Sequence, residues 1–370
     1  MPELARARAL ALRIAAYGLD SDEEPIDVGD NAWRQLIGYI STQRLSGIAS
    51  AAAGAGVLQL NDTQAEDLRE IHTADMMWTL ALERSLLSIA RAAGEEGVDL
   101  IVLKGPALAH DFYPDASWRA FADMDLLVRT SDWRRACAVL DRLGFHRQRP
   151  EPRAGFDERF GKAAVHVDHQ GLNVDLHRTL VLGSFGLWMH PEELFERTIR
   201  FTLAGVPLRR LDDTAMLLHA CVHAALGFQE PLLMPLRDLA QVARLGKPDW
   251  DELGRWAARW KLSGVIGHAF DEAERLIGFE QPSEVAGVRA IPVGRRERRA
   301  LDAYTTGLRA RGGTVRSSVW AVPGIRQKAE LIRAMFFPDP AFLAARTEEG
   351  ARPSYVRRWT VPIRWLLRRR

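Results

Sequence analysis

The sequence predicts an α+β protein in which a small mixed β-sheet core is flanked by N-terminal and C-terminal helical regions. In residues 1–93, apolar residues recur at helical spacings, and the alternation of apolar and polar residues that is typical of strands is absent. Short apolar runs bounded by glycine and proline follow, and helical spacing returns after Asp212. We therefore divide the chain into a helical region (1–93), an α/β core (94–211), a helical domain that closes the cleft (212–290) and a basic helical tail (291–370).

In the first region, Leu36, Ile37 and Ile40 have the spacing of one helix face. Asn61 is a residue type that caps helix N-termini, and acidic residues follow it in the early turns. Glycines at positions 94 and 97 are expected to end this region.

The core contains segments with the composition of strands. Residues 98–103 are a nearly continuous apolar run, which is typical of a buried strand. Gln170-Gly171 predicts a tight turn between two further strands. The expected strands are residues 98–103, 124–128, 163–169 and 172–180, with a hairpin over residues 201–211. Ser131 and Asp132 are expected to cap a helix that Gly144 ends.

In the C-terminal half, an Asp212-Asp213 cap predicts the start of a helix that holds His219 to Leu226, and further helices are expected at 236–245 and 250–262. Residues 282–292 predict a linker. Residues 357–370 contain six arginines and no acids, with tryptophan and leucine between them. Two interpretations stay open for this segment. One is a basic amphipathic helix that binds a membrane surface or an acidic partner weakly, and the other is a capping helix with a solvated arginine face.

The composition is that of a soluble globular protein, with 26% charged and 47% hydrophobic residues in 370. A net charge of +2 argues against a protein that holds nucleic acid along its surface. The two cysteines, Cys137 and Cys221, cannot form a disulfide framework, and no apolar run reaches the length of a membrane span. We therefore expect a cytoplasmic protein.

Three carboxylates indicate a metal site. Asp123 and Asp125 lie two residues apart at the predicted strand 124–128, so alternation places both on one face. Like charges held this close repel unless a cation neutralises them. Asp175 lies on another predicted strand and supplies a third carboxylate. Oxygen ligands of this kind suit Mg²⁺, and three carboxylates on adjacent strands can hold two ions. The sequence therefore predicts a site for two Mg²⁺ ions at these residues.

A phosphate-binding segment is expected next to this site. Lys104 and Gly105 follow the predicted strand 98–103, and Pro106 suits the first turn of a helix. Glycine allows close backbone approach, the amides of a helix N-terminus attract phosphate, and a lysine adds a charged contact.

The run LKGPALAHDFYPDASWRAFADMDLLV (103–128), with VDLH at 174–177, resembles the uncharacterised nucleotidyltransferase family of the DNA polymerase beta-like superfamily. The resemblance covers roughly residues 70–360, including the segments HACVHAA and RDLAQVARL. Members of this family often lie near genes for lasso-peptide or surface-polysaccharide biosynthesis.

The resemblance implies a Mg²⁺-dependent enzyme that moves a nucleoside monophosphate from an NTP, ATP by default, to an acceptor and releases pyrophosphate. The acceptor would be a hydroxyl or phosphate of a small molecule or peptide natural product. Asp123 and Asp125 would be the metal pair, and Asp175 the third carboxylate and general base. Gly105 would be the phosphate-loop glycine, and Arg119 would contact the triphosphate or steady the aspartates.

One departure from the family pattern opens an alternative. The superfamily loop usually reads Gly-Ser or Gly-Gly, whereas Pro106 follows Gly105 here and has no N–H to offer a phosphate. A catalytically degenerate nucleotide- or peptide-binding protein with the same fold is therefore a second hypothesis. An enzyme that acts on nucleic acid, like tRNA-end nucleotidyltransferases, is a third, and the small net charge argues against it.

Other polar residues are candidates for the pocket wall. His177 is expected to share a strand face with Asp175 and to line the site, and His223 to reach the acceptor or base. Arg237 and Asp238 are expected to form an ion pair, either in the pocket wall or purely structural. A zinc site at the helical segment 219–223 is disfavoured, because its cysteine points to a different side of the helix from its two histidines.

Overall fold

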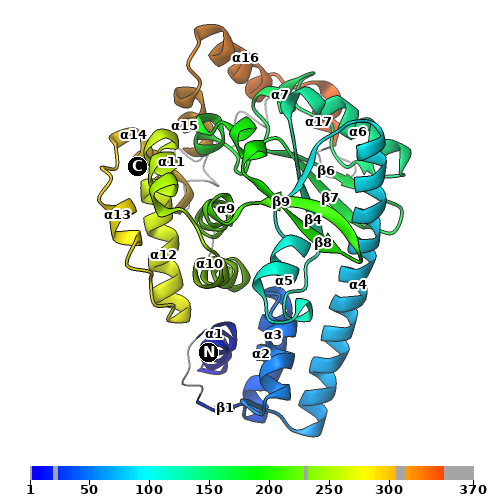
Figure 1. Cartoon of the computed structure of the whole chain (residues 1–370), viewed down its shortest axis with the longest axis vertical. Helices are drawn as coiled ribbons and strands as arrows, with labels where there is room; N and C mark the ends of the chain where they lie inside the picture. The colour runs from blue at the N-terminus through cyan, green and yellow to red at the C-terminus, as the bar shows by residue number, and fades with distance from the viewer. Residues whose placement is uncertain (1, 20–23, 229–231, 306–312, 346–370) are drawn as a thin grey trace.

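The computed structural model describes residues 2–19, 24–228, 232–305 and 313–345 (Figure 1). At its centre lies a seven-stranded mixed sheet with the order β5-β6-β7-β4-β3-β9-β8. The strands are β3 (Leu100–Val102), β4 (Asp123–Val128), β5 (His146–Arg147), β6 (Ala163–Val167), β7 (Asn173–His177), β8 (Thr198–Leu203) and β9 (Val206–Leu211). The predicted α+β class is confirmed.

The two predicted hairpins are present. β6 and β7 pair antiparallel, and so do β8 and β9. Gly171 and Gly205 turn the chain between them with φ of 86° and 79°, which is the region that favours glycine. The central strand β4 pairs parallel with β7 and antiparallel with β3. This topology places strands from three separate parts of the core side by side.

The N-terminal region is mainly helical. Its helices are α1 (Pro2–Ala16), α2 (Asp30–Thr42), α3 (Ser46–Gly54) and α4 (Asp62–Glu95). The predicted cap is confirmed, because the Asn61 side chain accepts a hydrogen bond from the Gln64 N–H. The expectation of helix throughout is wrong at two places, where β1 (Ile26–Asp27) and β2 (Leu58–Gln59) pair in parallel. Strands of two residues are too short to leave an alternating pattern in the sequence.

Helices also fill the rest of the chain. Within the core region lie α5 (Pro106–Phe112), α6 (Trp133–Arg142), α7 (Phe156–Arg159) and α8 (Ser184–Trp188), with single turns η1 (Ala116–Trp118), η2 (Thr130–Asp132) and η3 (Pro191–Glu196). After the sheet follow α9 (Asp213–Leu226), α10 (Leu233–Leu245), α11 (Trp250–Trp260), α12 (Ser263–Ile277), α13 (Val285–Arg289), α14 (Arg295–Thr305), α15 (Gly313–Ala321), α16 (Ile325–Phe336) and α17 (Pro340–Ala344).

Four expectations for the helical parts of the chain have different outcomes. Asp212 caps α9 as predicted, by accepting from the Ala215 N–H. Asp132 precedes α6 but makes no capping bond, because its carboxylate pairs with Arg135 instead. The predicted linker at 282–292 contains the helix α13. The arginine-rich segment 357–370 lies outside the described residues.

Figure 1 shows α4 along one side of the sheet, with α9 and α10 on the other side and α1 to α3 at one end. One large hydrophobic core joins these helices to the sheet. A second, small cluster centres on Phe160, Val322 and Leu331, where α7 and α8 meet α15 and α16. Among the helices of the described residues, none is both long and apolar enough to cross a membrane.

Candidate functional site

The candidate site lies where β4 and β7 run in parallel. Their register places Asp125 directly beside Asp175 and Asp123 beside Asn173. Asp123 and Asp125 share a face of β4 because side chains alternate along a strand. The fold therefore brings two segments fifty residues apart in the sequence to adjacent positions on one sheet face.

Asp125 is the most buried of the three carboxylates, with 2% of its surface exposed. The Lys104 ammonium lies 2.8 Å from its Oδ2, and His177 Nε2 lies 2.9 Å from its Oδ1. Burial alone would raise the pKa of Asp125, but the Lys104 charge and the His177 hydrogen bond outweigh it and hold that pKa well below its usual range. Asp125 is therefore ionised at neutral pH.

Lys104 also faces Asp123, with its Nζ 3.5 Å from Asp123 Oδ1. Burial would lower the pKa of Lys104, but Asp125 and Asp123 raise it overall. A second cation comes from the N-terminal region, because Arg44 Nη1 lies 4.0 Å from the same Asp123 oxygen. Arg44 was not among the residues predicted for the site, and the sequence around it carries no signal that connects it to β4.

Asp175 is in a different electrostatic situation. Burial, Asp125 and Asp123 together raise its pKa above its ordinary value. Ligand atoms of Asp125, Asp175 and His177 lie within 4.8 Å of one another, which is close enough for one cation to contact all three. Asp123 is not part of this group, although its carboxylate lies on the same face. The oxygen atoms suit hard ions such as Mg²⁺, and the histidine nitrogen also suits Mn²⁺ or Zn²⁺.

Gly105 ends the segment that carries Lys104, directly before α5. Its φ of 63° is a backbone conformation that side chains rarely adopt, and a β-carbon there would lie 3.3 Å from the Phe121 ring. Pro106 occupies the first position of α5 as predicted. Gly105 lines the smaller cavity and Pro106 follows it directly. Glycine is required at position 105 because of the positive φ of the backbone there.

Arg119 does not contact the aspartates of the sheet. Its Nε and Nη2 donate to the two oxygens of Asp238, each at 2.7 Å, and the Tyr113 hydroxyl donates to Asp238 Oδ1 at 2.8 Å. Arg237 donates instead to the backbone carbonyls of Ala15 and Tyr17. The expected pairing of Arg237 with Asp238 is therefore wrong, because neighbouring residues on α10 point in different directions.

The histidines of α9 lie behind the site. His219 Nδ1 lies 3.1 Å from the Leu103 carbonyl oxygen, and burial lowers the pKa of His219 to about 3. Burial and the Lys104 charge also hold the pKa of His223 well below its usual value. No group of metal-ligating atoms around Cys221 appears in the part of the chain that the structure describes. Both histidines are therefore neutral; His219 is buried, whereas His223 is partly exposed and faces the smaller cavity.

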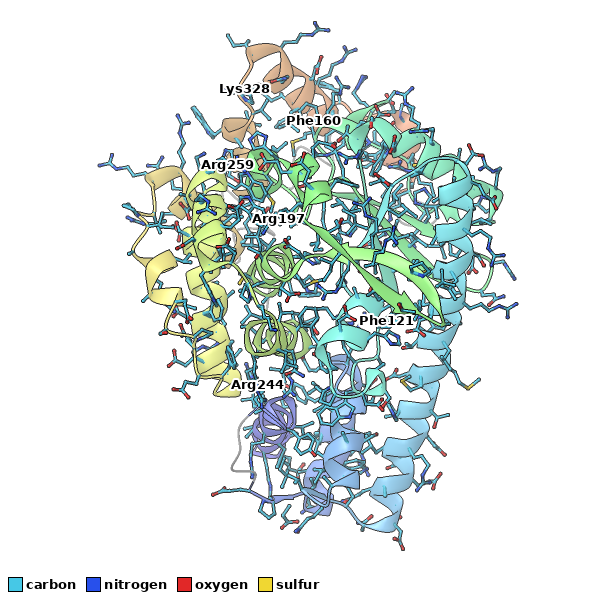
Figure 2. All side chains as sticks on the ribbon, in the orientation of Figure 1. Phe121, Phe160, Arg197, Arg244, Arg259 and Lys328 are labelled. Carbon is cyan, nitrogen blue, oxygen red and sulfur yellow. The ribbon has the colours of Figure 1, made fainter. Side chains whose placement is uncertain are left out.

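Two cavities border the carboxylates, one lined by Asp123 and the other by Asp175. The smaller cavity has a volume of about 120 Å³. Its wall includes the residues expected to bind nucleotide, Lys104, Gly105 and Arg119, and the expected metal ligand Asp123. The pocket candidates His223 and Asp238 also line it, together with Arg44 and Phe121. The larger, about 460 Å³, is lined by Asp175 and Lys162 among others. Figure 2 labels Phe121 beside α5 and Phe160 beside α7, one from each cavity. His177 and Arg237 line neither.

Lys162 is the second residue that sequence reasoning missed. It lies directly before β6 and next to the strand that carries Asp175. Burial lowers the pKa of Lys162 in spite of the nearby carboxylates. A signal was available in the sequence, since Lys162 directly precedes the predicted strand 163–169.

Similarity to known proteins bears on the family of this chain and not on the geometry of its site. No curated protein matches the sequence. Among solved structures, the chain is similar to an antigenic nucleotidyltransferase-like protein from Paracoccidioides brasiliensis, at 16% identity over 55% of this chain and 95% of that chain, with a TM-score of 0.35. A likeness this weak does not bear on function. Residues 29–278, more than half of the chain and including the whole sheet, match the family described as uncharacterised nucleotidyltransferase. The chain therefore belongs to the uncharacterised nucleotidyltransferase family.

Proposed function

We propose that this protein is a Mg²⁺-dependent nucleotidyltransferase. It would move a nucleoside monophosphate from an NTP, ATP by default, to a hydroxyl or phosphate of a small-molecule or peptide acceptor. The observation that carries this proposal is the adjacent pair Asp125 and Asp175 on parallel strands, with Asp123 on the same face. Among the described residues, Lys104 and Arg44 lie within ion-pair distance of Asp123 or Asp125, and Asp175 has no such partner.

The carboxylates of Asp123, Asp125 and Asp175 would hold the metal, two ions in our proposal, with the His177 nitrogen beside them. Bound Mg²⁺ would neutralise the triphosphate and lower the pKa of the attacking hydroxyl. Asp175 is suited to receive that hydroxyl proton, because its pKa is already raised by burial and by its acidic neighbours. The two aspartates therefore differ in their pKa: Asp125 is buried and ionised, whereas Asp175 accepts a proton more readily.

We assign the triphosphate to the smaller cavity. Lys104, Gly105 and Arg44 line it, and the two cations there would attract phosphate oxygens. Lys104 contacts both Asp123 and Asp125, so metal bound to these carboxylates would release its ammonium toward the nucleotide. Arg119 would act at a distance, by holding Asp238 and the cavity wall in place.

A second candidate function is nucleotide or peptide binding without turnover. Pro106 favours it, because this position offers no backbone N–H to a phosphate. The same nucleotide site would be present, but the α-phosphorus would not be held for attack. The two candidates differ in whether pyrophosphate is released.

The testing experiment is thermal denaturation with each of the four NTPs, with and without Mg²⁺. A ligand at 100 times its Kd stabilises a folded protein by about 2.7 kcal/mol, which is a Tm rise of a few degrees for a long chain. We expect one NTP to raise Tm only in Mg²⁺, and Asp125→Asn to lose that rise. Glu70→Gln removes an exposed carboxylate of α4 and should retain it.

Pyrophosphate release from that NTP, measured with an acceptor panel, separates the two candidates. Metal-dependent release that disappears in Asp125→Asn supports the transferase. Binding without release across the panel favours the binding protein. An unchanged Mg²⁺ response in Asp125→Asn would contradict both.

A further inference from the structure

The larger cavity starts at the proposed metal site. Asp175 belongs both to the metal-ligating group and to the cavity wall. The cavity has a volume of about 460 Å³, within the range of roughly 300–1,000 Å³ that holds small organic ligands. A molecule bound in it would therefore have atoms beside the carboxylate that we assign as proton acceptor.

Most of the cavity wall is apolar. Phe156 and Phe160 come from α7 and its end, Leu187 comes from α8, and Leu331 and Phe342 come from the C-terminal helices. Several of these residues form the second, small hydrophobic cluster. Figure 2 shows Phe160 where these helices meet, at the far end of the molecule from α1. This wall fits an aromatic or aliphatic body better than a sugar or a polyphosphate.

Two cations in the wall, Lys162 and Arg149, have no ion-pair partner among the described residues, and Lys162 is the more buried of the two. Within the described part of the chain, no hydrogen bond or ion pair engages the Lys162 ammonium, although Asp125 and Asp175 are near enough to influence it. The cavity's Arg147, in contrast, is paired with Asp157. A largely buried ammonium without a partner is unfavourable, and a bound anion would supply the missing contact.

We propose that the larger cavity is the acceptor site and that the acceptor is an anionic amphipathic molecule. Its aryl or alkyl body would lie against Phe156, Phe160 and Leu187, and its carboxylate, sulfate or phosphate would pair with Lys162. This inference rests on the proposed function.

In the transfer, the acceptor hydroxyl would lie beside Asp175. Its oxygen forms a bond to the α-phosphorus of the NTP, and the bond from that phosphorus to the oxygen of the β-phosphate breaks. The hydroxyl proton passes to Asp175, and pyrophosphate leaves. The anionic group on Lys162 remains unchanged throughout.

The test uses two fluorescent probes that differ in one charge. Anilinonaphthalene sulfonate has an aromatic body and an anionic group, and N-phenylnaphthylamine has the body alone. Both are titrated into the full chain without Mg²⁺ or nucleotide. Hydrogen bonds to charged groups contribute about 1.5–3 kcal/mol, so Lys162→Met should weaken sulfonate binding by about tenfold to a hundredfold. Binding of the uncharged probe should not change.

Matched variants locate the binding. Leu182→Asp introduces a negative charge at a half-exposed residue of the cavity wall and should weaken both probes. Lys247→Met and Leu245→Asp make the same changes at exposed positions outside the cavity and should weaken neither.

Two outcomes would overturn the acceptor site. One is sulfonate binding that is equal in Lys162→Met and the wild type. The other is a Lys162→Met variant that loses the Mg²⁺-dependent nucleotide response instead, because Lys162 would then serve the triphosphate. Failure of the proposed function has a different signature, namely that no NTP raises Tm in Mg²⁺ whatever the probes do.

Discussion

Two buried carboxylates, Asp125 and Asp238, are both 2% exposed, yet they meet positive charge in different ways. Asp238 accepts two bonds of 2.7 Å from Arg119 and one from the Tyr113 hydroxyl, so each charge has one well-aligned partner. Asp125 has Lys104 and His177, but it also lies beside the carboxylate of Asp175.

The difference separates a structural ion pair from a site that favours a further cation. The Arg119–Asp238 pair is balanced in charge and joins the segment before β4 to α10, so it stabilises the fold without a ligand. On β4 and β7, Asp175 lies beside the ionised Asp125 and has no ion-pair partner of its own among the described residues, and this like-charge contact is unfavourable until a cation binds. Local departures from the most stable arrangement are expected at functional sites.

The largest expected effect is on the balanced pair. Removing one partner of a buried ion pair costs about 3–5 kcal/mol, because the other charge is left buried and unpaired. Asp238→Leu should therefore lower Tm strongly in thermal denaturation without ligands. The double variant Arg119→Met with Asp238→Leu should recover most of the loss, because replacement of a whole buried pair by apolar residues is often neutral. A double variant no more stable than the single one would show that the pair does more than join two elements.

A smaller effect on stability is expected at His219, whose Nδ1 lies 3.1 Å from the carbonyl oxygen of Leu103, the residue before Lys104. Its pKa is about 3 in the folded protein, below the ordinary value of 6.5. As pH falls below about 6.5, the unfolded chain takes up a proton that the folded chain does not, so stability is lost. For one histidine the loss is about 2 kcal/mol at pH 5.

His219→Gln should therefore show a shallower fall of Tm between pH 7 and pH 5 than the wild type. His190→Gln changes an exposed histidine and should keep the wild-type slope. If the Tm curves of His219→Gln and wild type run parallel, His219 is accessible to protons in the folded state.

The smallest expected effect is an increase in stability, on replacement of Asp175. Burial and the neighbouring acids raise the folded-state pKa of Asp175, so its ionised form lowers stability at neutral pH. Asp175→Asn should therefore raise Tm slightly at pH 7 without metal, and this gain should disappear as the pH falls below the ordinary carboxyl pKa of 3.8, where the carboxyl becomes protonated in both states. In Mg²⁺ with nucleotide, the variant should lose the ligand-dependent rise. A metal-free Tm below that of the wild type would place Asp175 with the structural carboxylates.

Local features of this molecule were predictable from its sequence. The Asn61 and Asp212 caps and the hairpin turns at Gly171 and Gly205 depend on a few neighbouring residues, and the structure contains all four. The placement of Asp123 and Asp125 on one face follows from the alternation of a strand. Metal binding and catalysis by these residues remain predictions.

Contacts between distant segments were not predictable in the same way. Arg119 pairs with a residue 119 positions away, and Arg44 reaches Asp123 from the N-terminal helices. Such contacts depend on how helices and strands cross, which no short-range periodicity reports. The pairing expected for Arg237 and Asp238 failed for a local reason instead, because adjacent residues of a helix face different neighbours.

The longer helices, the main strands of the sheet and the carboxylates on β4 therefore follow from the sequence, because they depend on hydrophobic period and turn chemistry, whereas two-residue strands and the helix α13 do not. Which charges are paired depends on the tertiary structure. It balanced Asp238 with Arg119, placed Lys104 between Asp123 and Asp125, and left Lys162 facing a cavity. The physical reason is that ion pairing depends on distances of a few ångströms between groups far apart in the chain, which packing sets.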